Sequence, residues 1–177
     1  QDMSIEHTLT EDWDLKLFTH EEILNNPQNR LHYVYKRMPE KVQHKWDSVY
    51  APRIAEYRKG NLKGKELISW KYQQYMRDYL ATTLAVDENI GRLMNYLEQI
   101  GELDNTIIVY TSDQGFFLGE HGWFDKRFMY EECQRMPLII RYPKAIKAGS
   151  ISNAISMNVD FAPTFLDFAG VEIPEDI

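Results

Sequence analysis

Apolar residues recur every three or four positions along the middle of the chain. From residue 65 to about residue 100 this spacing places them on one broad face, as in an amphipathic α-helix. Gly101 ends the pattern, and Asp104 and Asn105 favour a turn. We therefore predict one long helix over residues 65–100 with this face buried. The face contains Tyr75, Met76, Tyr79, Leu80, Thr83, Leu84, Val86, Ile90, Leu93, Met94, Leu97 and Ile100.

Two short apolar runs follow the predicted helix. Residues 106–111 (TIIVYT) and 137–142 (PLIIRY) are typical of strands covered by helices on both faces. The order helix, strand, loop, helix, strand, helix predicts an α/β fold with a mainly parallel or mixed sheet. Four shorter helices are expected, at residues 21–25, 39–59, 129–136 and 161–169. Thr19 opens the first, and Pro52 puts a kink or break in the second. The last lies between Asp160 as N-cap and Gly170 as stop. The remainder of residues 1–35 is polar and is expected to be irregular.

Composition excludes several classes of function. A chain of 177 residues with 44% apolar content fits one domain or a large part of one. Its net charge of −7, without clustered Lys or Arg, argues against nucleic-acid binding. The single Cys133 excludes an intrachain disulfide and a Cys-rich zinc site. No apolar run approaches the roughly 18 residues that span a bilayer, and no signal peptide is visible in this segment.

The loop after the first predicted strand holds the candidate chemistry. Asp113 and Gln114 lie beyond the carboxyl end of that strand, where α/β sheets bind ligands. A carboxylate beside a carboxamide suits a hard cation such as calcium or magnesium and poorly suits zinc or copper. Calcium takes about six to eight oxygen ligands, so the other ligands must come from elsewhere.

The rest of this loop allows both a functional and a structural interpretation. Gly115, Gly119 and Gly122 permit turns that other residues disfavour and let a substrate approach the main chain. His121 can bond a substrate oxygen or shuttle a proton, or it can be purely structural. Lys126 can hold an anionic oxygen, but composition alone favours a solvated loop lysine.

Longer motifs in and around this loop identify a family resemblance. The run TSDQGFFLGEHG at residues 111–122, followed by DKRFMYEE at residues 125–132, resembles the type I sulfatases of the alkaline phosphatase superfamily. The similarity continues in YLATTLAVDENIG at residues 79–91, MPLIIRYP at residues 136–143 and VDFAPTFLDFAG at residues 159–170.

The resemblance implies a fold and a division of the chain. It implies an alkaline-phosphatase-like mixed sheet flanked by helices, with the long helix before the strand of the metal loop. Residues 65–177 would be the C-terminal portion of the catalytic α/β domain. Residues 1–64 would be an irregular and helical peripheral segment.

The resemblance also implies roles for the loop residues. Asp113 and Gln114 would be calcium ligands, Lys126 would contact the sulfate or its leaving oxygen, and His121 would lie near the substrate. A divalent cation and a lysine can offset the negative charge that develops as an S–O bond breaks. The expected substrate is a sulfated carbohydrate, because residues 125–131 resemble the loop of N-acetylglucosamine-6-sulfatases and related glycosaminoglycan sulfatases. Such a substrate would carry 6-O-sulfated N-acetylglucosamine or related glycosaminoglycan units.

Part of the family's machinery is absent from this sequence. Type I sulfatases use a formylglycine made from Cys or Ser in a Cys/Ser-x-Pro-x-Arg motif, and neither Cys133 nor Ser48 has that spacing. The two acidic metal ligands that the family places near its N-terminus are missing as well. We therefore expect this chain to need the N-terminal half of the same catalytic domain as its partner, and to be inactive as an isolated segment.

Two other functions remain open. One is a phosphomonoester or phosphonate hydrolase of the same superfamily, which shares the metal loop. The other is a non-catalytic binding domain, against which the joint presence of Asp113, Gln114 and Lys126 argues. By resemblance, the protein would be periplasmic or secreted if bacterial, and lysosomal if animal.

Overall fold

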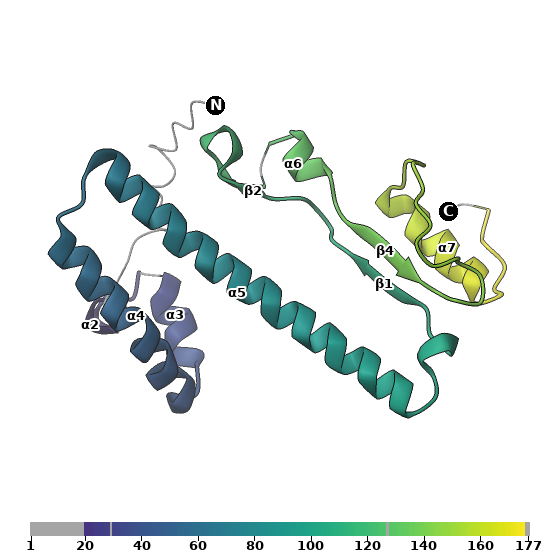
Figure 1. The fold of residues 1–177 in the computed structure, drawn as a ribbon, viewed down its shortest axis with the longest axis horizontal. Helices are drawn as coiled ribbons and strands as arrows, with labels where there is room; N and C mark the ends of the chain where they lie inside the picture. Colours follow the sequence, from purple (N-terminus) through teal and green to yellow (C-terminus); the bar gives the residue numbers. More distant parts are fainter. Residues whose placement is uncertain (1–19, 29, 127, 176–177) are drawn as a thin grey trace. The chain divides into compact units, whose positions relative to one another are not determined.

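The computed structural model describes residues 20–28, 30–126 and 128–175 (Figure 1). The predictions for residues 1–19, including Thr19, lie outside these ranges. The described residues form two compact units, one within residues 1–85 and 118–125 and the other within residues 86–117 and 126–177.

Helices dominate the described part of the chain. In chain order the elements are α2 (His20–Asn25), α3 (Arg30–Arg37), α4 (Glu40–Gly60), α5 (Gly64–Gln99), η2 (Leu103–Asn105), β1 (Ile108–Thr111), β2 (Phe117–Leu118), η3 (Glu120–Gly122), β3 (Phe124–Asp125), α6 (Glu131–Gln134), β4 (Leu138–Arg141), η4 (Asn158–Asp160) and α7 (Phe161–Phe168), where η marks a 3₁₀ turn.

Helix α5 confirms the long predicted helix to within one residue at each end. Gly101 follows it with φ +74°, and the N–H of Glu102 donates to the carbonyl of Leu97 at 2.9 Å, which closes the helix. The predicted burial of its apolar face is wrong for the described residues, since Leu80 and Leu84 are each 57% exposed. No helix in the part of the chain that the structure describes is long and apolar enough to cross a membrane.

Helix α4 runs through Pro52 without a break, so the predicted break is wrong. Contacts with α5 hold the helix on both sides of the proline. Before it, the hydroxyl of Tyr50 donates to Asp78 at 2.9 Å, and just after it Arg53 donates to Asp78 at 2.7 Å. Farther on, Tyr57 stacks on Trp70 with ring centroids 5.3 Å apart. These contacts offset the backbone hydrogen bond that proline cannot make.

Helix α3 was not predicted, because residues 30–35 were assigned to an irregular region. Its Tyr35 is 2% exposed and donates to the carboxylate of Asp47 in α4 at 2.7 Å. His32 also contacts the carbonyl of Ile23 in α2 at 2.7 Å. Tertiary packing against α2 and α4 therefore stabilises a helix too short to be evident from its sequence.

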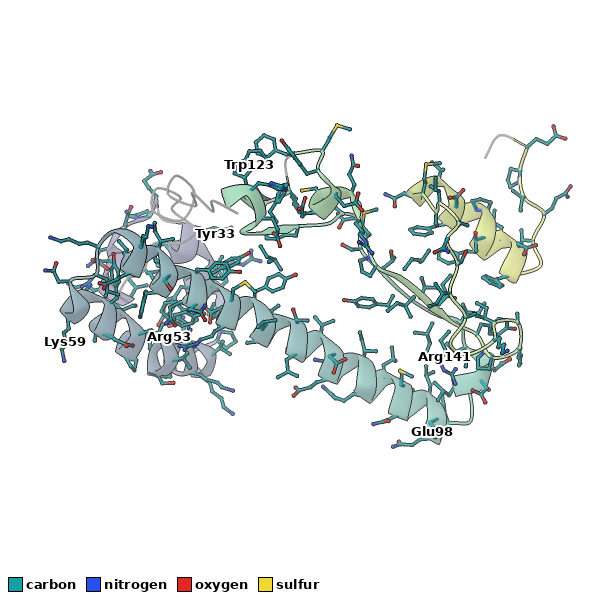
Figure 2. The ribbon with its side chains drawn as sticks, turned by 45° about the horizontal axis from the view of Figure 1, so that its top comes forward. Tyr33, Arg53, Lys59, Glu98, Trp123 and Arg141 are labelled. Carbon is teal, nitrogen blue, oxygen red and sulfur yellow. The ribbon has the colours of Figure 1, made fainter. Side chains whose placement is uncertain are left out.

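Strands β1 and β4 pair antiparallel, with Ile108 opposite Arg141 and Thr111 opposite Leu138 (Figure 1). This antiparallel pair agrees with the predicted mixed sheet. Burial of both strands on both faces is also wrong within the described residues, since Ile139 is 63% exposed. Arg141 ties the end of β4 to η2 by donating to the carbonyl of Leu103 at 2.7 Å (Figure 2).

The last two helices match their predictions in part. Helix α6 covers only Glu131–Gln134 of the predicted residues 129–136. Asp160 precedes α7 as predicted, but its carboxylate accepts from the N–H of Met157 at 2.7 Å and makes no side-chain bond into the helix. Gly170, at φ +67°, is confirmed as the stop after α7.

Candidate functional site

Asp113 and Gln114 lie immediately after β1, as predicted. The preceding Ser112 organises this turn, because its hydroxyl donates to the carbonyl of Gln114 at 2.7 Å. The same oxygen lies 3.4 Å from the Gln114 nitrogen and 3.5 Å from an Asp113 carboxylate oxygen. A serine hydroxyl bonded to the backbone two residues on is a common way to fix a tight turn.

The side chains of Asp113 and Gln114 remain available to a ligand. Apart from the long contact with Ser112, neither has a hydrogen bond or ion pair within the described residues. Asp113 is exposed and Gln114 is half-buried. A carboxylate oxygen and a carboxamide oxygen on one turn fit a hard divalent cation.

These two side chains can provide only part of a metal site. Calcium takes about six to eight oxygen ligands, and magnesium requires an octahedral set. Within the ranges that the structure describes, no group of three or more His, Cys, Asp or Glu side chains could hold a metal ion. That the other ligands come from elsewhere stays a prediction.

Gly115 differs from its predicted role. Its N–H donates to the carbonyl of Cys133 in α6 at 2.8 Å, and its φ is not positive. A Cβ at this position would lie 2.0 Å from the carbonyl oxygen of Glu132. The space beside Gly115 is thus filled by the backbone of α6 and is not open to a substrate. Here glycine is required by the close approach of two backbones.

His121 lies in the turn η3 between β2 and β3, in the unit that contains residues 118–125. Gly119 (φ +113°) and Gly122 (φ +76°) take left-handed conformations, as predicted for these turns, and His121 does so too at φ +56°. The carboxylate of Glu120 accepts from the N–H of Leu118 at 2.6 Å and braces the turn. The substrate role of His121 remains a prediction.

Lys126 is exposed, and its ammonium has no hydrogen bond or ion pair among the residues that the structure describes. It follows Asp125, whose φ of +75° is strained for a residue with a side chain. Lys126 belongs to the same compact unit as Asp113 and Gln114, but no described contact joins it to either. Its role as a sulfate contact therefore remains a prediction.

Two structural features of this loop were not found from the sequence. The role of Ser112 could have been predicted, because a serine often bonds to the backbone of the residue two positions on, here Gln114. The support from Glu132 and Cys133 had none, since nothing local in the sequence reveals which distant backbone lies against a glycine.

Comparisons with known proteins find similarity to sulfatases. A family model described as N-sulphoglucosamine sulphohydrolase, C-terminal, matches residues 119–177. The chain is 86% identical over all 177 residues to the N-acetylglucosamine-6-O-sulfatase of Bacteroides thetaiotaomicron. It is also 42% identical over 93 residues, or 52% of its length, to the human N-acetylglucosamine-6-sulfatase.

A solved structure gives the same result in three dimensions. The structure of a protein in complex with its substrate, D-glucosamine-2-N,6-O-disulfate, matches the whole chain with a TM-score of 0.87 and 86% identity. The likeness supports an α/β, alkaline-phosphatase-like fold. The chain spans 36% of that solved chain, 32% of the Bacteroides relative and 17% of the human relative.

Proposed function

We propose that this chain is part of a type I sulfatase and that it supplies part of the catalytic domain of an enzyme that hydrolyses sulfate esters of carbohydrates. The parent is the protein, of the length of its relatives, that would contain this chain. The observation that carries the proposal is the turn after β1, where Asp113 and Gln114 present uncommitted oxygen donors.

The proposed substrate contains 6-O-sulfated N-acetylglucosamine or a related glycosaminoglycan unit. Two of the similar proteins are named N-acetylglucosamine-6-sulfatases, and the substrate in the solved complex is a glucosamine with a 6-O-sulfate. The 86% identity over the whole chain favours a substrate of the same class.

We further propose that Asp113 and Gln114 hold calcium, with the remaining ligands supplied by the rest of the parent. When bound, the cation would offset charge on the sulfate oxygens. Lys126, exposed and unpaired in the described structure, would present its ammonium to the sulfate or to the leaving oxygen. Negative charge on that oxygen grows as the S–O bond breaks, so a cation placed there lowers the barrier. His121 would bond a substrate oxygen.

The proposed partner of this chain is the N-terminal half of the same catalytic domain. The buried apolar side chains among the described residues are few, namely Ile23, Tyr35, Ile54, Phe117 and Cys133. By contrast, strand β4 and helix α5 expose large apolar side chains that soluble proteins normally cover. A domain with about twice as many additional residues, as in the relatives, can provide that cover.

The proposal is tested by measuring sulfate release from 6-O-sulfated N-acetylglucosamine by the parent, before and after calcium removal with a chelator. We expect turnover that falls on chelation and returns with added calcium. The isolated 177-residue chain serves as a negative control and should release no sulfate.

Other outcomes of this assay identify the alternatives. Phosphate release from a phosphomonoester or phosphonate without sulfate release would favour the hydrolases of the same superfamily. No turnover of either ester by a folded parent that carries the Cys/Ser-x-Pro-x-Arg motif would favour a binding domain and would overturn the proposed activity.

A further inference from the structure

We infer that Gly115 is a positioning residue for the metal ligands. Its backbone packs against the backbone of α6, and this close packing holds Asp113 and Gln114 in place. The inference rests on the proposed role of Asp113 and Gln114 in binding calcium. It concerns a residue that contributes no ligand itself and that acts through its closeness to a second backbone.

The contact between Gly115 and α6 is unusually close. The N–H of Gly115 donates to the carbonyl of Cys133 at 2.8 Å, and a Cβ on Gly115 would lie 2.0 Å from the Glu132 oxygen and 2.9 Å from its carbonyl carbon. Real Cβ atoms essentially never approach another atom within 3.0 Å. Any other residue would therefore force the two backbones apart by about 1.0 Å, the difference between 3.0 and 2.0 Å.

A movement of this size is large on the scale of metal coordination. Calcium–oxygen distances lie between about 2.3 and 2.6 Å, so a displacement of roughly 1 Å takes a ligand out of range. Gly115 directly follows Gln114 and is two residues from Asp113, so a shift of its backbone moves both ligands. Close packing at Gly115 thus fixes where the two oxygen donors lie.

The support behind this contact is itself well packed. Cys133 is buried, and its N–H donates to the carbonyl of Tyr130 at 3.0 Å. Phe117 is fully buried, and its ring meets the edge of the Tyr130 ring with centroids 6.1 Å apart. The turn that carries the ligands therefore rests on a side-chain layer that resists displacement.

The test compares Gly115→Ala with Gly91→Ala in the parent. Gly91 lies inside α5, has no positive φ, and an added Cβ there would meet nothing within 4 Å. Calorimetric titration gives the calcium dissociation constant, and a calcium series gives kcat and KM. We expect Gly115→Ala to raise the dissociation constant at least tenfold and to regain most of its turnover at high calcium, with Gly91→Ala within twofold of wild type.

A merely structural role would give a different result. Gly115→Ala would then lower the melting temperature of the calcium-free protein but leave the dissociation constant within twofold of wild type, which would overturn the inference. If Gly115→Ala does not fold, Phe117→Leu replaces it, because this change thins the support without a backbone clash. We expect a two- to fivefold weaker calcium affinity for Phe117→Leu, and an unchanged affinity would likewise overturn the inference. If wild-type parent binds no calcium at all, the proposed function fails instead.

Discussion

Single side chains on the turn after β1 determine the proposed chemistry, and Asp113 is the most decisive of them. Its carboxylate is exposed and has only a 3.5 Å contact with Ser112 in the described structure. Replacing it with Ala in the parent should lower calcium affinity and reduce sulfate release about 100-fold or more, because a charged ligand is lost. Calorimetry and a sulfate-release assay measure the two effects. Asp87→Ala, an exposed carboxylate on α5, is the control and should change neither.

Lys126 should separate charge stabilisation from metal binding. Lys126→Ala in the parent is expected to lower kcat roughly 10²- to 10³-fold, the usual effect of removing one group that stabilises transition-state charge. Calcium affinity should remain near wild type, since an ammonium cannot be a ligand. Steady-state kinetics with calorimetry provide both values, and Lys65→Ala, an exposed lysine at the start of α5, is the matched control. A kcat within threefold of wild type would exclude a sulfate contact.

At the residue scale, the sequence predicted where the candidate side chains lie along the chain but not how the backbone around them is held. Asp113 and Gln114 could be located because they follow an apolar run that had to be a strand, and β1 confirms that order. The role of Gly115 could not be predicted, because glycine permits both a left-handed turn and a close backbone approach. Only the position of Glu132 in space distinguishes the two.

Whole elements were predictable where one pattern continued over many turns. Helix α5 repeats its apolar spacing for 36 residues, and the structure places its ends within one residue of the prediction. Helix α3 has only 8 residues and depends on tertiary contacts such as the Tyr35–Asp47 hydrogen bond. Of the kink or break predicted at Pro52, the break is wrong, because local rules for proline do not include the contacts that α5 makes on both sides of it.

The link between α4 and α5 gives a prediction at the scale of elements. Burial, followed by the hydrogen bond to Asp78, raises the pKa of Tyr50 from 10.0 to about 12. The neutral phenol is thus favoured by folding, so this stabilisation is complete below pH 10 and is lost as the pH rises toward 12. At pH 8, Tyr50→Phe should lower the free energy of unfolding by about 1 kcal/mol, the typical net value of such a hydrogen bond.

Urea unfolding of the parent and its Tyr50→Phe variant from pH 8 to 12 measures this contribution. The difference between the two proteins should be constant up to about pH 10 and then shrink, following the pKa shift of Tyr50. Tyr96→Phe, at an exposed tyrosine of α5, should change the free energy of unfolding by less than about 0.5 kcal/mol at every pH. A difference for Tyr50→Phe that does not vary with pH would contradict the assigned hydrogen bond.

At the scale of the molecule, apolar side chains that the sequence predicted to be buried are exposed, and they need cover from another part of a protein. The periodic spacing in α5 and the apolar run in β4 marked these elements for burial, yet Leu84 and Ile139 are more than half exposed in the structure. A sequence pattern shows that a face requires cover but not which part of a protein provides it. The relatives, of which this chain spans about a third or less, contain enough additional residues to do so.

The isolated chain should also bind calcium weakly, because most of the proposed calcium ligands lie outside it. Asp113 and Gln114 provide two side-chain oxygen donors, whereas calcium takes about six to eight ligands. Calorimetry on residues 1–177 alone should therefore show calcium binding at least about 100-fold weaker than in the parent, since most of the ligands are missing. The Asp113→Ala form of the isolated chain, titrated in parallel, shows how much of any residual heat comes from this turn. Micromolar binding by the isolated chain that disappears in this variant would mean that the chain already contains a complete site, and the proposed sharing of calcium ligands with the rest of the parent would be wrong.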